Sequence, residues 1–330
     1  MSLTSSNPSD IQLVKELSES VVKIKNEIHK VIVGQDEVID NTLVALLAGG
    51  HTLLVGVPGL AKTLLIKTIA DVLDLNFSRI QFTPDLMPGD ITGTEIIEED
   101  QLSKKREFKF IRGPIFSNII LADEINRTPP KTQSALLEAM QEHNVTAMGN
   151  SYKLDEPFFV LATQNPIEQE GTYPLPEAQL DRFMFNLWLD YPSYKEEIEI
   201  IKSTTSDVVP TLQKIISKDE LINFQKLVKR VPVADNVIEY AIKKVKQTRP
   251  TETEDVQLKE WISWGAGPRA SQYLIIAAKT KAIINGRFTP NIEDVKSSLL
   301  PVLRHRIIPN FSAEADGITS LEIINKLLKD

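Results

Sequence analysis

The sequence predicts an α/β fold in its first part and an all-helical domain in its second part. Strand-like and helix-like segments alternate over about the first 190 residues, which favours a mostly parallel sheet covered by helices. After Tyr191, apolar residues recur at spacings of three and four, as in amphipathic helices, and no convincing strand is seen. The length of 330 residues also favours two domains. We place them at residues 1–205 and 206–330, with the junction between Tyr191 and Val209, where prolines and a Ser/Thr run interrupt the pattern.

Short apolar or β-branched runs are the predicted strands, and longer amphipathic stretches are the predicted helices. The strands are His51–Val57, Phe77–Phe82, Asn118–Asp123, Phe158–Asn165 and Met184–Asp190. The helices after Tyr191 are Lys195–Ser203, Lys218–Lys229, Val237–Gln247, Pro268–Asn285 and Ile292–Arg304.

Two stretches within the first part have the alternation and turn residues of hairpins. One joins Thr94–Glu98 to Glu107–Ile111 through the polar segment Asp100–Lys105. The other runs from Val145 to Leu154 and turns at Met148-Gly149-Asn150. Loop-length statistics leave open that either stretch is only an extended loop.

The composition excludes several classes of protein. Apolar residues make up 42% and charged residues 25%, which is typical of a folded chain with a sizeable core. No apolar run approaches the roughly 20 residues of a membrane helix, and the N-terminus lacks a signal-peptide core. The absence of cysteine excludes disulfides and thiol nucleophiles, and the four histidines are too dispersed for a common zinc site. We expect a cytoplasmic protein without membrane insertion.

The net charge of −8 bears on the choice of partner. A non-specific nucleic-acid surface needs clustered Lys and Arg to displace counterions, so the acidic balance makes nucleic acid an unlikely partner. A local basic groove remains compatible with this charge.

The strongest motif is Gly56-Val57-Pro58-Gly59-Leu60-Ala61-Lys62-Thr63, which follows a predicted strand and opens a helical run at Leu64. Glycines let backbone N–H groups wrap a phosphate, and the helix N-terminus adds the positive end of its dipole. Lys62 would neutralise the outer phosphates of a nucleotide, and the Thr63 hydroxyl would ligate Mg²⁺. The motif therefore predicts a P-loop, or Walker A loop, of an NTPase. Ala61 stands where the general pattern has its second glycine, and a small residue there does not guarantee the same backbone torsions.

A second nucleotide element is expected on another strand, and Asp123-Glu124 at the end of the run Asn118–Asp123 provides it. Ligands of open α/β sheets bind at the carboxyl ends of the strands. Asp123 would hold Mg²⁺, and Glu124 would polarise the attacking water. Alone, such a pair more often caps a strand at the surface; downstream of a phosphate loop, the catalytic interpretation is favoured.

The strand Phe158–Asn165 ends in a polar amide followed by Pro166. Asn165 could hydrogen-bond both the attacking water and the γ-phosphate of a nucleotide, which would position the nucleophile without adding charge. Asn-Pro is also a common turn, so this assignment depends on the two preceding elements.

Together these residues resemble the MoxR-type AAA+ ATPases. The matching segments are Gly56–Thr63, Ile119–Arg127, Ala162–Pro166, Gly171–Phe183 and Gly267–Ala270, and the resemblance runs from about Val33 to about Ile307. The segment Tyr173–Phe183 is the most specific of them. The resemblance implies a core sheet in the strand order 5-1-4-3-2 with an all-helical lid, ATP and Mg²⁺ as cofactors, and Ala61 as an ordinary variant of the loop.

The resemblance also implies roles for residues outside the strand ends. Val33-Gly34-Gln35 would lie near the adenine. Arg182 matches the arginine finger; its alternative is an ordinary ion-pair partner of Asp181. Arg269 matches the sensor 2 position, from which it could reach back to the γ-phosphate; its alternative is a helix-surface arginine. Arg127 could contact nucleotide or a neighbouring subunit. The two hairpins would match elements that similar proteins direct at substrates or a central pore.

The function implied by the resemblance is ATP hydrolysis in a ring, expected to be a hexamer, coupled to remodelling or maturation of a client protein. Similar proteins often work beside a partner with a von Willebrand factor A domain, which here would have to be a separate chain. The alternatives are a magnesium-chelatase-like motor, a nucleic-acid-acting AAA+ ATPase and a non-catalytic ATP-dependent scaffold. The sequence of Leu175–Phe183 favours a MoxR-type ATPase over a magnesium-chelatase-like motor, and the net charge argues against a nucleic-acid-acting ATPase.

Overall fold

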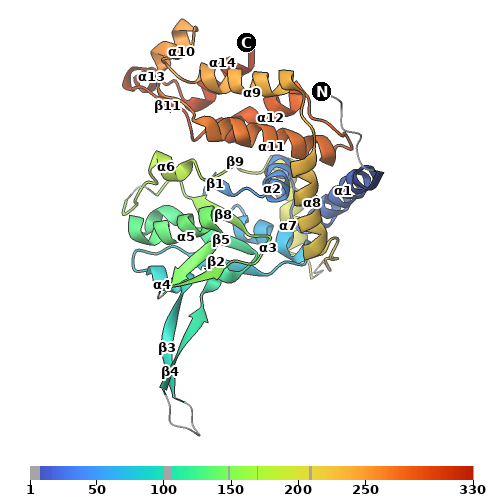
Figure 1. The fold of residues 1–330 in the computed structure, drawn as a ribbon, viewed down its shortest axis with the longest axis vertical. Helices are drawn as coiled ribbons and strands as arrows, with labels where there is room; N and C mark the ends of the chain where they lie inside the picture. Colours follow the sequence, from blue (N-terminus) through green and yellow to red (C-terminus); the bar gives the residue numbers. More distant parts are fainter. Residues whose placement is uncertain (1–7, 100–105, 148, 169, 208–209, 330) are drawn as a thin grey trace.

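The computed structural model describes residues 8–99, 106–147, 149–168, 170–207 and 210–329, and its centre is a five-stranded parallel sheet (Figure 1). The strands lie in the order β2-β5-β8-β1-β9, and all neighbours pair in parallel. Numbered one to five along the chain and read from β9, this is the predicted order 5-1-4-3-2. Their bounds are β1 (Thr52–Gly56), β2 (Phe77–Gln81), β5 (Ile119–Asp123), β8 (Phe159–Gln164) and β9 (Phe185–Leu189).

The inner strands are buried and mostly apolar because both faces of the sheet are covered. Every residue of β1 and of β5 is buried, as expected for parallel strands with helices on both sides. Successive side chains of a strand point to opposite faces. Leu53 and Leu54 accordingly belong to two different apolar clusters, one on each side of the sheet.

Helices and short turns connect the strands of this first part. The sequence analysis named no helix for the first 50 residues, where α1 and α2 lie. Proline at the first turn starts α4 and α5, where its missing N–H would have no partner. The elements are α1 (Pro8–Ile28), α2 (Asp36–Ala48), α3 (Lys62–Val72), α4 (Pro88–Thr92), α5 (Pro130–Glu142), α6 (Glu177–Leu180) and the 3₁₀ turns Pro114–Phe116 and Ile125–Arg127.

The helices predicted after Tyr191 are all present. Ser193, Ser217 and Asn291 form capping boxes that fix the first turns of α7, α8 and α12. The predicted helices correspond to α7 (Tyr194–Thr204), α8 (Lys218–Arg230), α9 (Asp235–Gln247), α11 (Pro268–Ile284) and α12 (Ile292–Leu303). Three shorter helices were not predicted: α10 (Val256–Trp261), α13 (Phe311–Ala315) and α14 (Ser320–Lys329).

The prediction of an all-helical second part is wrong in one detail. β10 (Ile262–Trp264) and β11 (Ile308–Pro309) form a small antiparallel pair, and the Ser263 hydroxyl donates to backbone carbonyls of β11. Strands of three and two residues are too short to show an alternating pattern. Their pairing depends on the packing of the surrounding helices, which brings the two segments together.

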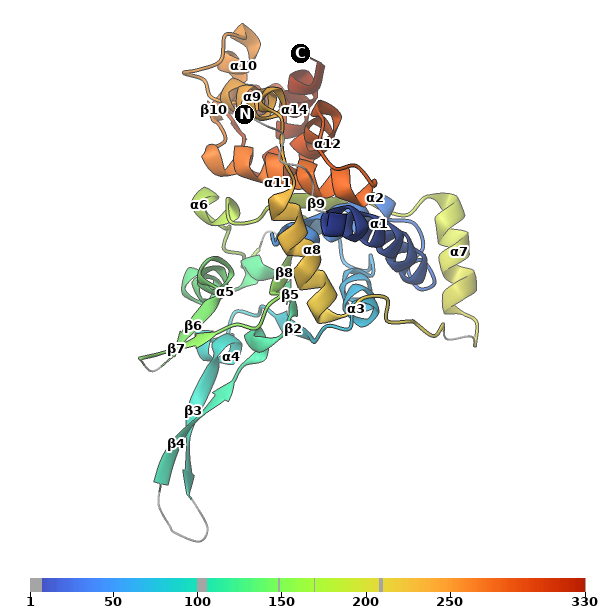
Figure 2. The same ribbon diagram turned by 45° about the vertical axis from the view of Figure 1, so that its right-hand side comes forward.

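The helices α9, α11, α12 and α14 form a layer beside the sheet, as both ribbon views show (Figures 1 and 2). One apolar cluster continues from the sheet into α8, α11 and α12, so the two parts of the chain share buried surface. The boundary after residue 205 remains a prediction. Among the described residues, no helix combines the length and apolar character that crossing a bilayer requires.

Both predicted hairpins are present. β3 (Gly93–Glu99) pairs with β4 (Arg106–Arg112), and β6 (Asn144–Ala147) pairs with β7 (Asn150–Lys153). The predicted turn segment Asp100–Lys105 lies outside the described residues, as does Met148. The β3–β4 hairpin projects away from the body, at the end opposite the helical layer (Figure 2). Its base is held by stacking of Phe110 on Tyr152 of β7, with ring centroids 4.5 Å apart.

Candidate functional site

The loop between β1 and α3 has the backbone of a phosphate-binding loop. Gly59 has φ +87°, and Ala61, which caps α3, has φ 56° and ψ 25°. Ala61 therefore adopts the left-handed conformation that glycine takes easily, which answers the question the sequence left open about its torsions. Among the described residues, no backbone acceptor pairs with the N–H groups of Val57, Gly59, Leu60 or Ala61. These donors are available to an anion.

The charged and hydroxyl groups of the motif lie at the start of α3. Lys62 Nζ donates to the Gly56 carbonyl at 2.6 Å, and Thr63 is half-buried in the first helical turn, followed by the exposed Leu64. Burial lowers the pKa of Lys62, and the negative charges of Asp123 and Glu124 partly oppose that shift. The negative charge of a bound triphosphate would likewise raise the pKa of Lys62 and favour its charged form.

Gln35 brings the segment Val33-Gly34-Gln35 into contact with this loop, and the expected place of the segment near the adenine stays a prediction. Gln35 has φ 60° and donates through Nε2 to the Leu60 carbonyl at 3.3 Å, while its Oε1 is buried without a partner among the described residues. Gly34 has φ +66°, and a Cβ there would lie 2.0 Å from Oε1 of Glu196 on α7. Glu196 could turn its flexible side chain away, so the left-handed backbone is what favours glycine at position 34.

Asp123 ends β5 and Glu124 follows it, at the same edge of the sheet as the phosphate loop and beside the end of β8. Thr163 Oγ1 donates to Asp123 Oδ1 at 2.6 Å and accepts the Glu124 N–H at 2.9 Å. This buried hydroxyl fixes both acids relative to β8. Glu124 has φ 57° and ψ 49°, a strained backbone that persists only where surrounding contacts enforce it.

Asn165 follows β8 directly and is 5% exposed. Its Oδ1 accepts the Ile167 N–H at 3.2 Å, whereas its Nδ2 is buried without a partner among the described residues. An unpaired buried amide is costly unless a ligand or water completes it. The unpaired Asn165 Nδ2 and the loop N–H groups without backbone acceptors in the described part of the chain are donors that a bound nucleotide could complete, so the residues at this edge fit a nucleotide.

Two residues of the site were missed by the sequence analysis, and both lie on β2. Arg79 donates through Nε and Nη2 to Asp123 Oδ2, at 3.1 and 2.6 Å, and Gln81 Nε2 donates to Glu124 Oε2 at 3.0 Å. Arg127 lies next to the acids, with its Nη1 3.1 Å from Glu124 Oε2, and its contact with nucleotide or a neighbouring subunit stays a prediction. The signal was available, because Arg79 and Gln81 alternate with Ile80 and so share one face of a strand.

Magnesium is the metal that the donor set fits. No group of three or more His, Cys, Asp and Glu side chains suited to a metal occurs in the described part of the chain. Mg²⁺ is commonly held by one or two carboxylates together with substrate phosphates, not by a complete protein cage. Asp123 and the Thr63 hydroxyl would supply the protein side of such a shell.

Arg182 and Arg269 lie elsewhere. β9 runs parallel to β1, with Phe185 opposite Thr52 and Leu189 opposite Gly56. Arg182, just before Phe185, therefore lies at the amino ends of the strands, whereas the phosphate loop follows their carboxyl ends. Arg269 belongs to the same end, because its Nη1 pairs with Asp181 Oδ2 at 3.5 Å. The structure thus does not bring Arg269 back to the phosphate loop of its own chain.

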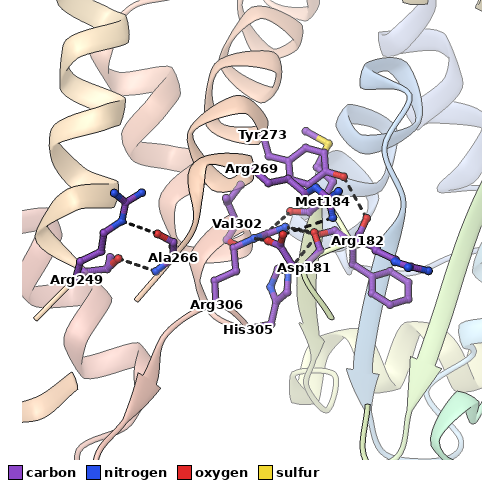
Figure 3. A network of polar contacts seen from close by, with 12 residues as sticks. Asp181, Arg182, Met184, Arg249, Ala266, Arg269, Tyr273, Val302, His305 and Arg306 are labelled. Atoms are coloured by element: carbon purple, nitrogen blue, oxygen red, sulfur yellow. Dashed lines mark hydrogen bonds and ion pairs between the residues drawn. The ribbon is translucent and has the colours of Figure 1, made fainter. Parts of the chain in front are cut away.

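A network of polar contacts holds the segment around Arg182 (Figure 3). Arg306, whose side chain is 2% exposed, places Nε 2.7 Å from Asp181 Oδ1 and donates to the carbonyls of Asp181 and Phe183 at 2.9 and 2.7 Å. The Tyr273 hydroxyl donates to the Arg182 carbonyl at 3.1 Å, and burial raises its pKa. Sequence reasoning gave no sign of Arg306, since its partners Asp181 and Phe183 lie more than 100 residues away.

A cavity of about 480 Å³ opens beside this network. It is lined by α6, by the segment before α11 and by the residues before β11. Burial and the neighbouring Arg306 cation hold the pKa of His305 in its wall well below the usual range. The cavity lies at the amino end of the sheet, away from the phosphate loop.

Comparison with known proteins decides the family. The model for the ATPase family associated with various cellular activities (AAA) matches residues 51–185, and the AAA lid domain model matches residues 258–327. Chaperone MoxR1 of Mycobacterium tuberculosis is 45% identical over 304 residues, covering 92% of this chain and 79% of that protein. The chain belongs to the MoxR family of AAA ATPases.

A further relative and a solved structure agree. The uncharacterized protein YeaC of Bacillus subtilis is 42% identical over 95% of both chains. The crystal structure of a protein of Cytophaga hutchinsonii, described as a candidate ATPase, superposes with a TM-score of 0.89 at 44% identity over 96% of both chains. The predicted family, fold class and ATPase activity are thereby confirmed. The roles of individual residues in this MoxR-family ATPase remain proposals.

Proposed function

We propose that this MoxR-family protein hydrolyses ATP with Mg²⁺ at sites shared by neighbouring subunits of a ring. One observation carries the proposal: the phosphate loop and the acids lie at the carboxyl edge of the sheet, while Arg182 and Arg269 lie at the amino edge. A strand of five residues spans about 13 Å, and neither arginine side chain reaches that far. A single chain therefore holds two halves of different sites.

The carboxyl edge would bind the nucleotide. The loop from Gly56 to Leu64 would wrap the phosphates, with Lys62 on the outer ones, and the Gly34–Gln35 turn would flank the adenine. Thr63 and Asp123 would hold Mg²⁺, and Glu124 would polarise the attacking water. Asn165 would use its unpaired Nδ2 to orient that water against the γ-phosphate.

The amino edge would complete the site of a neighbour. Arg182 would neutralise charge in the transition state as an arginine finger, and Arg269, next to it across Asp181, would act from the same side. Contact between the amino edge of one subunit and the carboxyl edge of the next is head-to-tail, and such contacts close into rings when the rotation permits. A hexamer is the expected ring.

The ring would remodel or mature client proteins, since a relative of the chain is named a chaperone. The β3–β4 hairpin is suited to contact a client because Ile97 and Phe108 face each other across it and are 59% and 74% exposed. A separate protein with a von Willebrand factor A domain is the expected adaptor. Affinity capture with Glu124→Gln and ATP would identify the client or adaptor by trapping the bound ring.

Mixed rings test the shared site. Glu124→Gln should lower turnover by about two to four orders of magnitude by removing the base. Arg182→Ala should lower it by about three to five orders, while ATP affinity stays near that of the wild type. In rings that contain both subunits, an intact loop can meet an intact arginine, so turnover should partly recover. The same recovery is expected when Arg269→Ala replaces Arg182→Ala.

A matched control separates this result from ring stabilisation. Lys62→Ala and Glu124→Gln both damage the carboxyl edge, so a ring mixed from these two should stay inactive. If rings verified to contain both Arg182→Ala and Glu124→Gln subunits also stay inactive, Arg182 does not act in the neighbour's site. If turnover recovers with Arg182→Ala but not with Arg269→Ala, then only Arg182 acts in the site of the neighbouring subunit.

A further inference from the structure

The acids of the catalytic edge are already paired with side chains of β2. Both Arg79 contacts converge on a single oxygen, Asp123 Oδ2. The other oxygen, Oδ1, accepts the Thr163 hydroxyl. Since a carboxylate has about four lone-pair positions, one position on Oδ1 remains for a further donor or for the shell of a metal ion.

Arg79 also connects the two acids. Its Nη2 donates to Gln81 Oε1 at 2.5 Å, and Gln81 Nε2 donates to Glu124 Oε2 at 3.0 Å. The chain of contacts Asp123–Arg79–Gln81–Glu124 therefore fixes the proposed metal ligand and the proposed base through a single guanidinium. A planar guanidinium with several fixed donors suits this double task better than a lysine ammonium.

The position of Arg79 leaves it free to move. β2 is an edge strand of the sheet, and the Arg79 side chain is 47% exposed, whereas that of Asp123 is 11% exposed. Leaving Asp123 would return the guanidinium to water without opening the core. Mg²⁺ at Asp123 would replace the positive charge that Arg79 supplies to that carboxylate and would repel the guanidinium.

We propose that Arg79 is an internal counter-cation of the catalytic acids, and that Mg²⁺ must compete with it for Asp123. This inference rests on the proposed function and adds a positioning residue to it. When the metal is bound, the guanidinium loosens its hold on Asp123, and the Arg79–Gln81 contact that restrains Glu124 loosens with it. Glu124 would then keep its contact with Nη1 of Arg127, at 3.1 Å, but lose the restraint that runs through Gln81. Arg79 thus sets the Mg²⁺ concentration at which the site becomes competent.

The test measures metal binding directly, without turnover. A fluorescent ADP analogue, mant-ADP, is bound to the full-length protein without divalent metal, and MgCl₂ is then titrated while its fluorescence is followed. In Arg79→Gln, the MgCl₂ concentration that gives half of the fluorescence change should fall about tenfold. This is the expected effect of removing the repulsion between Mg²⁺ and a monovalent cation a few ångströms away in surroundings of high dielectric constant. Arg79→Lys should lie between Arg79→Gln and the wild type. Lys67→Gln, which removes one exposed positive charge from α3, should match the wild type.

A double-variant cycle shows whether the effect passes through Asp123. In an Asp123→Asn background, Arg79→Gln should no longer lower the MgCl₂ requirement, because the shared carboxylate is gone. An unchanged or increased requirement in Arg79→Gln would overturn the proposal, since it would make Arg79 a neutral or supporting neighbour of the metal. Failure of the wild type to bind mant-ADP at all would instead refute the proposed nucleotide site.

Discussion

Asp181→Ala would remove the carboxylate that balances the buried guanidinium of Arg306. The Arg306 side chain is 2% exposed and its Nε lies 2.7 Å from Asp181 Oδ1. Removing one partner of a buried ion pair costs about 3–5 kcal/mol, because the remaining charge has lost its compensation. Asp181 is 32% exposed, so water can replace part of its effect and the lower value applies. We expect a loss of about 3 kcal/mol in the free energy of unfolding.

Thermal unfolding measures this loss. At about 2 °C per kcal/mol for a chain of this size, Tm should fall by about 6 °C. Glu177→Ala is the matched control, because it removes an acidic side chain from exposed α6, one turn before Asp181. The double variant Asp181→Ala with Arg306→Met should lose less than the sum of the single variants, since no unpaired charge remains. A Tm equal to that of Glu177→Ala would refute the assignment of Asp181 as the balancing charge.

Turnover should respond as well, because Asp181 directly precedes Arg182. Asp181→Ala removes the side-chain contacts with Arg306 and Arg269, while the main-chain contacts of Arg306 and Tyr273 remain. The finger would be held less firmly, so kcat should fall. The phosphate loop lies at the other edge of the sheet, so ATP affinity measured by calorimetry should stay unchanged. Equal losses of ATP affinity and of turnover would show that the two edges are not separate.

Three further changes test other parts of the structure. Lys62→Ala should weaken ATP binding and turnover together, because the lysine is the point charge expected on the outer phosphates; wild-type affinity by calorimetry would make the loop only a turn. Ala61→Gly should raise the free energy of unfolding by about 0.5–1 kcal/mol, since glycine adopts φ 56° without strain; destabilisation in urea would contradict this. Burial lowers the pKa of His51 to about 4. As the pH is lowered from 6.5 to 4, the unfolded chain therefore binds a proton that the folded chain does not, and the free energy of unfolding decreases by up to about 3 kcal/mol. His51→Gln should flatten this dependence, and an unchanged slope would refute it.

Local pattern predicted much of the fold because the main elements are regular and strongly apolar. The apolar run at β1 and the helix after it predict the phosphate loop. The amphipathic spacing of α8 or α12 predicts a helix with one buried face. The β10–β11 pair escaped because two or three residues carry no period. In such short segments the surrounding packing, which no local pattern contains, decides the conformation.

The carboxyl-edge residues could be predicted because each stands at the end of a recognisable strand. Asp123 and Asn165 needed only the rule that parallel strands end at one edge. Arg79 and Arg306 could not be found in the same way, since their partners come from other strands and helices through tertiary packing. For Arg269, the local pattern predicted the start of a helix but contained no sign of the edge of the sheet beside which that helix begins.

The contacts at the amino edge tie the position of Arg182 to the helical layer. Tyr273 of α11 and Arg306, just after α12, bind main-chain carbonyls of Arg182 and Phe183, so these atoms move with those helices. If the proposed ring is correct, a phosphate that draws Arg182 towards a neighbouring subunit also pulls on the helical layer of the chain that supplies the arginine. ATP bound in one subunit would then act on the helices of the next without passing through that subunit's own phosphate loop. The loss of turnover expected for Asp181→Ala at unchanged ATP affinity would show that contacts between this segment and Arg306 and Arg269 affect turnover separately from ATP binding.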